Sequence, residues 1–186
     1  MSVTPEMLKV STEALDVWLD LDNALHADVM ELLERLYAKP SDQTCRRAYI
    51  RGAWGYIEGG IHGLYHFVRT MEDLAKDAHT KRPAERLGTI DRVKATLKWG
   101  SERIAPDWKP DFSTKGWRAV QSSLDLRDRL MHPKSAAQFN VSDEEAEIVR
   151  TGMMWFVATM RDLKQNSMDH ADSYNIERGK RGILGV

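Results

Sequence analysis

The stretch of sequence that decides the fold is residues 50–75, IRGAWGYIEGGIHGLYHFVRTMEDLA. Its apolar residues recur at alternating steps of four and three positions: Ile50, Trp54, Ile57, Ile61, Leu64, Val68, Met71 and Ala75. This period lines them up as one stripe along an α-helix, as in a helix packed within a bundle. We therefore predict a long helix that follows an N-cap at Ser41 and runs to about Ala78.

The opposite side of the same predicted helix is rich in glycine. It carries Gly52, Gly55, Gly59 and Gly63, and Gly60 lies between the two sides. Each glycine inside a helix costs roughly 1 kcal/mol relative to alanine, so some close packing must offset the cost. A smooth glycine face lets another helix approach closely. The sequence leaves open whether that helix belongs to the same chain or to a second subunit.

Four more helices are predicted on either side of this one, and no stretch favours a strand. They cover about residues 5–37, 83–104 and 113–131, with a last helix from about residue 141. The last start is the clearest, because Ser142 and Glu145 form a capping box. The proline-bearing residues 105–116 favour a loop. We expect an all-α, antiparallel bundle of about five helices in one domain, residues 1–170, followed by a flexible C-terminal tail, residues 171–186.

Composition favours a cytoplasmic protein. The chain has 186 residues, of which 42% are hydrophobic and 30% charged, as is typical of a soluble domain. Its longest apolar run, residues 153–160, is far shorter than the roughly 20 residues needed to cross a bilayer, and the N-terminal residues lack a signal-peptide pattern. The single cysteine, Cys45, can form no intrachain disulfide. We expect no membrane partner.

Charge is unevenly distributed along the chain. Residues 1–43 carry three basic and nine acidic side chains, whereas residues 81–134 carry thirteen basic and seven acidic ones. A basic segment of this kind can bind an anionic partner such as nucleic acid. The alternative is that the two segments face each other or the solvent.

An arginine interrupts the apolar side of the predicted fourth helix, in LDLRDRLMHPK, residues 124–134. Arg127 lies near the centre of the apolar arc, where a charge costs free energy unless it is paired or used. Five residues later comes His132, and Pro133 disfavours helical backbone at the residue before it. We therefore expect His132 to leave the helix and to swing toward Arg127. A histidine and a guanidinium together suit RNA cleavage, in which one transfers protons and the other stabilises charge on the phosphate.

On these residues the chain resembles the HEPN superfamily (higher eukaryotes and prokaryotes nucleotide-binding domains). The resemblance rests on RDRLMHP at the end of the fourth helix, the polar residue after the arginine, and the long helix that follows. It implies a homodimer in which Arg-x4-6-His motifs meet and form a metal-independent endoribonuclease, with Arg127, Asp128 and His132 as catalytic residues. It also implies a toxin or antiviral-defence role, with a possible antitoxin protein as partner. Other members are non-catalytic modules that bind a nucleotide or a partner protein. One subgroup has a tyrosine two positions after the histidine. Lys134 stands at that position here, so regulation through such a tyrosine is not implied.

Further RNA contacts are predicted near the motif. A polar row follows one edge of the second helix, and we assign substrate binding to Arg51, Glu58, His62 and Arg69 from that row and to Arg129 and Lys134 from the motif. Glu58 is the candidate carboxylate partner of Arg127. The row could instead be a solvated, salt-bridged edge, or Glu58, His62 and His66 could bind a metal, although steps of four residues fan their side chains apart. We expect no metal and no cofactor.

The tryptophans of the basic segment could stack on bases. Core packing is the expectation for Trp99 and Trp117. Trp108, in the proline-bearing loop, remains a possible RNA contact.

Overall fold

A computed structural model describes residues 5–75, 82–84 and 86–183, with side chains to residue 173. Its elements are α1 (Pro5–Ala38), α2 (Gln43–Ala75), α3 (Thr89–Ile104), α4 (Lys115–Met131), a 3-10 turn η1 (Ala136–Phe139) and α5 (Asp143–Ile183). The described residues contain no strand, so the predicted all-α helix bundle is confirmed. No described helix is long and apolar enough to pass through a membrane.

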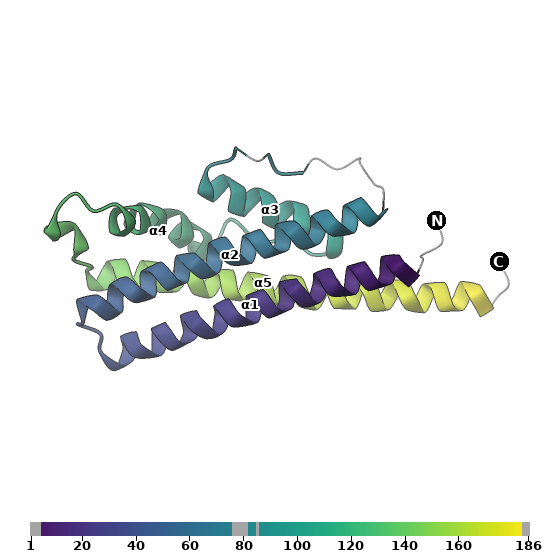
Figure 1. The fold of residues 1–186 in the computed structure, drawn as a ribbon, viewed down its shortest axis with the longest axis horizontal. Helices are drawn as coiled ribbons and strands as arrows, with labels where there is room; N and C mark the ends of the chain where they lie inside the picture. Colours follow the sequence, from purple (N-terminus) through teal and green to yellow (C-terminus); the bar gives the residue numbers. More distant parts are fainter. Residues whose placement is uncertain (1–4, 76–81, 85, 184–186) are drawn as a thin grey trace.

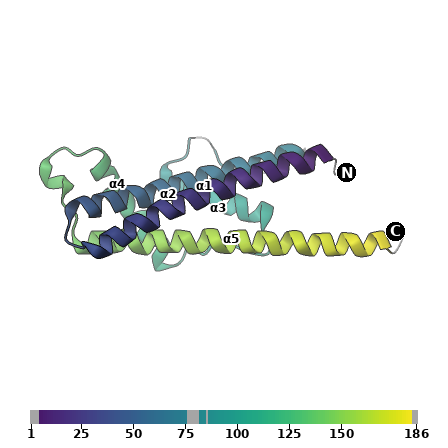
Figure 2. The ribbon, with the colours of Figure 1, turned by 60° about the horizontal axis from the view of Figure 1, so that its bottom comes forward.

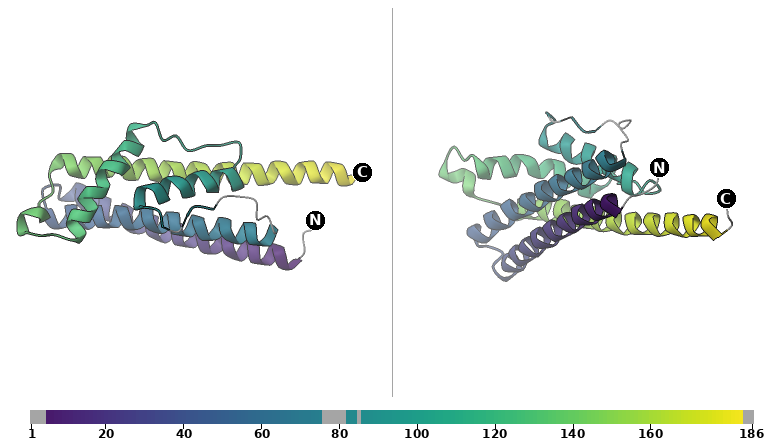
Figure 3. Two further views of the ribbon diagram at one scale, coloured as in Figure 1. Left: turned by 90° about the horizontal axis from the view of Figure 1, so that it is seen from above. Right: turned by 45° about the vertical axis from the view of Figure 1, so that its right-hand side comes forward.

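Helix α2 lies at the centre of the bundle (Figure 1). α1 runs antiparallel to α2, and α5 runs along one side of the α1–α2 pair (Figure 2). α4 crosses α5 obliquely (Figure 3). The predicted apolar stripe of α2 forms the core, since Ile50, Trp54, Ile57 and Leu64 are each at most 2% exposed. Trp99 and Trp117 are buried as well, at 3% and 2% exposure, as predicted.

The glycine face of α2 packs against α1 of the same chain. A Cβ at Gly52 would lie 2.3 Å from Leu32 Cδ1, and one at Gly59 would lie 2.5 Å from Leu25 Cδ1. Real Cβ atoms do not approach other atoms so closely, so a larger residue at either position would require the facing leucine side chain to shift, and glycine leaves room for these leucines against the α2 backbone. Only Gly55 of this face has open space beside it. The helix that offsets the cost of these glycines is therefore an intrachain one.

Three predicted helix boundaries need correction. The N-cap of α2 is Asp42 and not Ser41, because Asp42 Oδ1 accepts hydrogen bonds from the backbone N–H groups of Thr44 and Cys45, at 2.7 and 3.1 Å. α3 begins at Thr89 and not near Pro83. The Arg82 guanidinium donates hydrogen bonds to Glu72 and Asp73 near the end of α2. Arg82 therefore lies against α2 and not in a first turn of α3. Residues 76–78, predicted to end α2, lie outside the described residues.

The third correction concerns α5, which continues to Ile183, whereas the sequence predicts a tail from residue 171. Its last turns project beyond the other helices (Figure 2), so no apolar face is needed there and helical periodicity is absent from the sequence. The flexibility of residues 171–186 stays a prediction. The start of α5 is confirmed: Ser142 Oγ accepts from Glu145 N–H at 3.2 Å, and Glu145 Oε2 accepts from Ser142 N–H at 2.9 Å.

Candidate functional site

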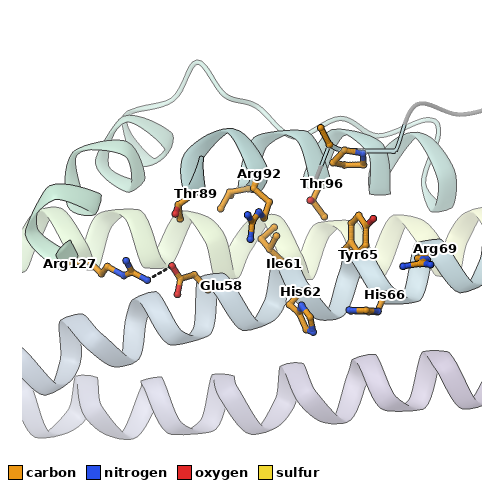
Figure 4. A pocket seen from close by; sticks show the side chains of 13 residues that line it. Glu58, Ile61, His62, Tyr65, His66, Arg69, Thr89, Arg92, Thr96 and Arg127 are labelled. Carbon is orange, nitrogen blue, oxygen red and sulfur yellow. Dashed lines mark hydrogen bonds and ion pairs between the residues drawn. The ribbon is translucent and has the colours of Figure 1, made fainter. Parts of the chain in front are cut away.

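Arg127 sits where α4 meets α2, held by two carboxylates. Its NH2 group donates to Glu58 Oε1 at 2.7 Å (Figure 4). Its NH1 group donates to Asp128 Oδ1 at 2.7 Å. The predicted pairing with Glu58 is therefore present. These contacts, above all the hydrogen bond to Asp128, raise the pKa of the Arg127 guanidinium above its ordinary value. The side chain remains 25% exposed, so the charge lies at a pocket wall and not in the core.

His132 ends α4, as the following proline predicts. It is the C-cap residue, with φ −129° and ψ 57°, and its backbone N–H donates to the carbonyl oxygen of Asp128 at 2.9 Å. Within the described residues no hydrogen bond joins the His132 and Arg127 side chains. Both line one pocket of about 520 Å³, which we call the motif pocket; its other lining residues are Asp128, Arg129, Lys134 and Gln138. The histidine and the arginine are thus brought to one open, cation-rich hollow.

Arg127 also lines a second hollow of about 650 Å³ between α2 and α3, which we call the interhelical pocket. The predicted Glu58, His62 and Arg69 line it from α2 (Figure 4). The motif pocket and the interhelical pocket share Arg127, so the polar row of α2 continues into the motif.

Two predicted contact residues have structural partners. Arg51 lines neither pocket; its NH2 group donates to the carbonyl oxygen of Leu130 at 2.9 Å, near the end of α4. Arg129 lines the motif pocket but forms an ion pair with Glu145 at the start of α5, at 2.9 Å. Arg51 and Arg129 therefore hold α4 against its neighbours, and their role toward RNA stays a prediction.

Sequence reasoning missed the contribution of α3. Thr89, Arg92 and Thr96 line the interhelical pocket opposite the α2 row. Their spacing of three and four positions places them on one helix face. This polar edge beside the apolar stripe of α3 is the sequence pattern that could have indicated a pocket wall.

The histidines of α2 lie close together, with the ring centroids of His62 and His66 at 4.3 Å. No three His, Cys, Asp or Glu residues in the described part of the chain are placed to hold a metal ion. Trp108 is half-buried and packs against the core, and its contact with RNA stays a prediction.

We expect His66 to titrate below its ordinary pKa of 6.5. Partial burial disfavours the charged ring, and the nearby His62 and Arg69 lower the pKa of His66 further. His66 is then predominantly neutral at pH 7. Two-dimensional NMR of the imidazole ring across pH would measure this pKa. Arg69→Gln should raise it and Arg161→Gln, on exposed α5, should not; equal curves for all three proteins would contradict the electrostatic explanation.

Comparison with known proteins finds no match among protein-family models, curated proteins or solved structures. The function is therefore argued from the residues of the two pockets.

Proposed function

We propose that this chain is a metal-independent endoribonuclease of HEPN type that acts as a homodimer. The observation that carries the proposal is that Arg127 and His132 line the same open pocket, together with Asp128. Lys134 adds positive charge beside them, which suits a polyanionic substrate.

In the proposed reaction the RNA 2′-oxygen attacks the adjacent phosphorus as the bond to the 5′-oxygen breaks. His132 either takes the 2′-hydroxyl proton while water protonates the departing 5′-oxygen, or protonates that oxygen while water takes the 2′-hydroxyl proton. Arg127 stabilises the charge on the phosphate. The products are a 2′,3′-cyclic phosphate and a 5′-hydroxyl. A guanidinium has five N–H donors, and the two carboxylates each take one from Arg127, so donors remain for a phosphate. Asp128 and Glu58 orient the guanidinium.

The second candidate function is a non-catalytic module that binds a nucleotide or a partner protein. The pairing of Arg127 with two carboxylates favours it, because they offset the charge that would stabilise a transition state. A toxin or defence role and an antitoxin partner belong to the first proposal and follow from the family resemblance alone.

The test is cleavage of a labelled, structured RNA in EDTA by the parent, Arg127→Ala and His132→Ala. We expect cyclic-phosphate ends from the parent and a rate lower by at least about 100-fold in each variant, the size typical of a lost charge-stabilising donor or proton-transfer group. Arg161→Ala and His170→Ala are matched controls on exposed parts of α5 and should cut like the parent.

Equal cutting by the parent and both motif variants would place the activity elsewhere or in a contaminant. An inert parent across several RNAs would leave the binding module as the better explanation.

A further inference from the structure

His62 and His66 of α2 form a pair of imidazoles that lies apart from the motif pocket. They are four positions apart, in HGLYH, residues 62–66, and their ring centroids are 4.3 Å apart, edge to face. Two histidines at this spacing lie on one face of a helix, as the two histidine ligands of zinc metalloproteases do. A single step of four residues turns the side chain by only about 40°, so both rings can reach one ion.

Both imidazoles are exposed and can be reached from two sides. They line the interhelical pocket and also a groove of about 580 Å³ between α1 and α2, which we call the α1–α2 groove. Figure 4 shows the two rings on the edge of α2 that faces α1, whereas Glu58 points toward Arg127. A ligand of the histidine pair therefore does not have to enter the core or displace the partner of Arg127.

The ring nitrogens of the pair are not used within the protein. Among the described residues, no hydrogen bond and no ion pair joins the His62 or His66 side chain to another group, and their ring contacts are with each other and with Tyr65. No protein partner has to be displaced before a metal ion binds to these nitrogens.

Two imidazole nitrogens select for a particular class of ion. Imidazole suits Zn²⁺, Cu²⁺ and Ni²⁺, whereas Mg²⁺ and Ca²⁺ prefer oxygen ligands. Zn²⁺ binds histidine nitrogen at about 2.0 to 2.1 Å and takes four ligands in a tetrahedron. Two histidines fill half of that tetrahedron, and water can fill the rest.

The charges around the pair are compatible with a cation. Arg69, three positions after His66, would repel a metal ion, but its guanidinium forms an ion pair with Asp73 at 3.7 Å. Glu13 lines the α1–α2 groove together with both histidines. Its side chain is 63% exposed, and its contact with Lys9 is a long one of 3.8 Å, so its carboxylate adds negative charge to the groove.

We propose that His62 and His66 chelate one divalent transition-metal ion, with Zn²⁺ as the test ion, at the edge of α2 between the interhelical pocket and the α1–α2 groove. Water completes the coordination. A site with two side-chain ligands exchanges its ion, unlike a structural zinc site with four. The described residues accordingly contain no three-ligand metal cluster. The proposal does not rest on the proposed RNA cleavage, which uses no metal.

The test is calorimetric titration of the untagged full chain with Zn²⁺ at neutral pH, in a buffer that does not bind metals. We expect one ion per chain with a Kd below about 100 μM, and no competition from Mg²⁺. His62→Ala and His66→Ala should each weaken binding at least about tenfold, because one of the two ligands is lost. His170→Ala, which removes an exposed histidine of α5, should bind Zn²⁺ like the parent.

Two further variants distinguish ligation from a structural role of the ring. His66→Phe keeps an aromatic ring at this position but has no nitrogen, so it should lose binding as His66→Ala does. A cysteine thiolate is also a zinc ligand, so His66→Cys should bind Zn²⁺ at least about tenfold more tightly than His66→Ala. Binding by His66→Phe that equals that of the parent would contradict ligation.

The proposal is overturned if the parent does not bind Zn²⁺ below about 1 mM, if Mg²⁺ competes equally, or if both alanine variants bind like the parent. Two-dimensional NMR of the imidazole rings locates the ion directly. Zn²⁺ should shift the signals of His62 and His66 and leave those of His132 and His170 in place. Shifts at His132 or His170 without shifts at the pair would place the ion elsewhere.

Failure of this proposal and failure of the proposed function can be told apart. EDTA should remove the ion from the histidine pair and leave RNA cleavage by the parent unchanged. His132→Ala should lose cleavage and still bind Zn²⁺ like the parent, because His132 does not line either hollow beside the pair.

Discussion

Gly152→Ala should lower the free energy of unfolding by about 3 kcal/mol, the upper part of the usual range for an overpacked core. A Cβ at Gly152 would lie 2.8 Å from the Val120 backbone nitrogen and 3.1 Å from both Ala119 C and Val120 Cα. These are backbone atoms of α4, so no side chain can rotate away, and α4 and α5 must move apart. Urea unfolding followed by far-UV circular dichroism would measure the change.

Gly55→Ala is the matched control, since a Cβ there meets nothing within 4 Å. It should stabilise the protein by about 0.5 to 1 kcal/mol, because alanine is the better helix former and restricts the unfolded chain. Opposite signs for the two variants would show that close helix crossing at Gly152 outweighs helix propensity. If Gly152→Ala unfolded at or above the parent's midpoint, the α4–α5 crossing described here would be wrong.

The glycines illustrate how far sequence alone reaches. Periodicity of three and four predicts a helix over residues 50–75 with a buried stripe, and the cost of Gly52 and Gly59 predicts a close neighbour on the other side. Nothing in α2 identifies that neighbour. Leu25 and Leu32 of α1 fill the face, and their seven-residue separation marks them only as apolar positions on some helix.

Helix ends were harder to predict than helix interiors. Asp42 and Ser41 are equally good capping residues, and only the chain path shows which one reaches the free N–H groups. The end of α5 was missed because apolar residues recur at helical spacing only where a helix packs against others. The last turns of α5 project past the bundle and show no such spacing.

For the candidate site, the partnership of Arg127 with Glu58 was predictable because both stand out from regular helical patterns. The hydrogen bond from Arg51 to the end of α4 was not predictable. An arginine that binds a carbonyl oxygen and one that faces solvent can occupy the same position in a helical sequence pattern. Thr96 was missed for a related reason: a threonine beside an apolar stripe is ordinary until its hydroxyl is seen to lack a hydrogen-bond partner among the described residues.

Glu72→Ala should cost about 3 to 5 kcal/mol of stability, the range measured when one member of a buried ion pair is removed. The Glu72 side chain is 3% exposed and accepts hydrogen bonds from Trp99 Nε1 at 3.0 Å, Arg103 Nε at 2.8 Å and Arg82 Nε at 2.7 Å. It thus joins α2 to α3 and to the segment before α3. Alanine would leave the buried Trp99 N–H without this acceptor and two guanidinium groups without their shared carboxylate.

Asp73→Ala is a close control for this variant, since Asp73 is the next residue and also binds Arg82. Its side chain is 57% exposed, and exposed ion pairs contribute at most about 1 kcal/mol. Glu72→Gln should fall between the two, because an amide oxygen can still accept from Trp99 while the charge is lost. Thermal unfolding of the three variants should therefore rank them Glu72→Ala, Glu72→Gln, Asp73→Ala from least to most stable. Similar small losses for Glu72→Ala and Asp73→Ala would mean that α3 is held to α2 by its apolar side chains alone, and that the α3 wall of the interhelical pocket does not depend on this carboxylate.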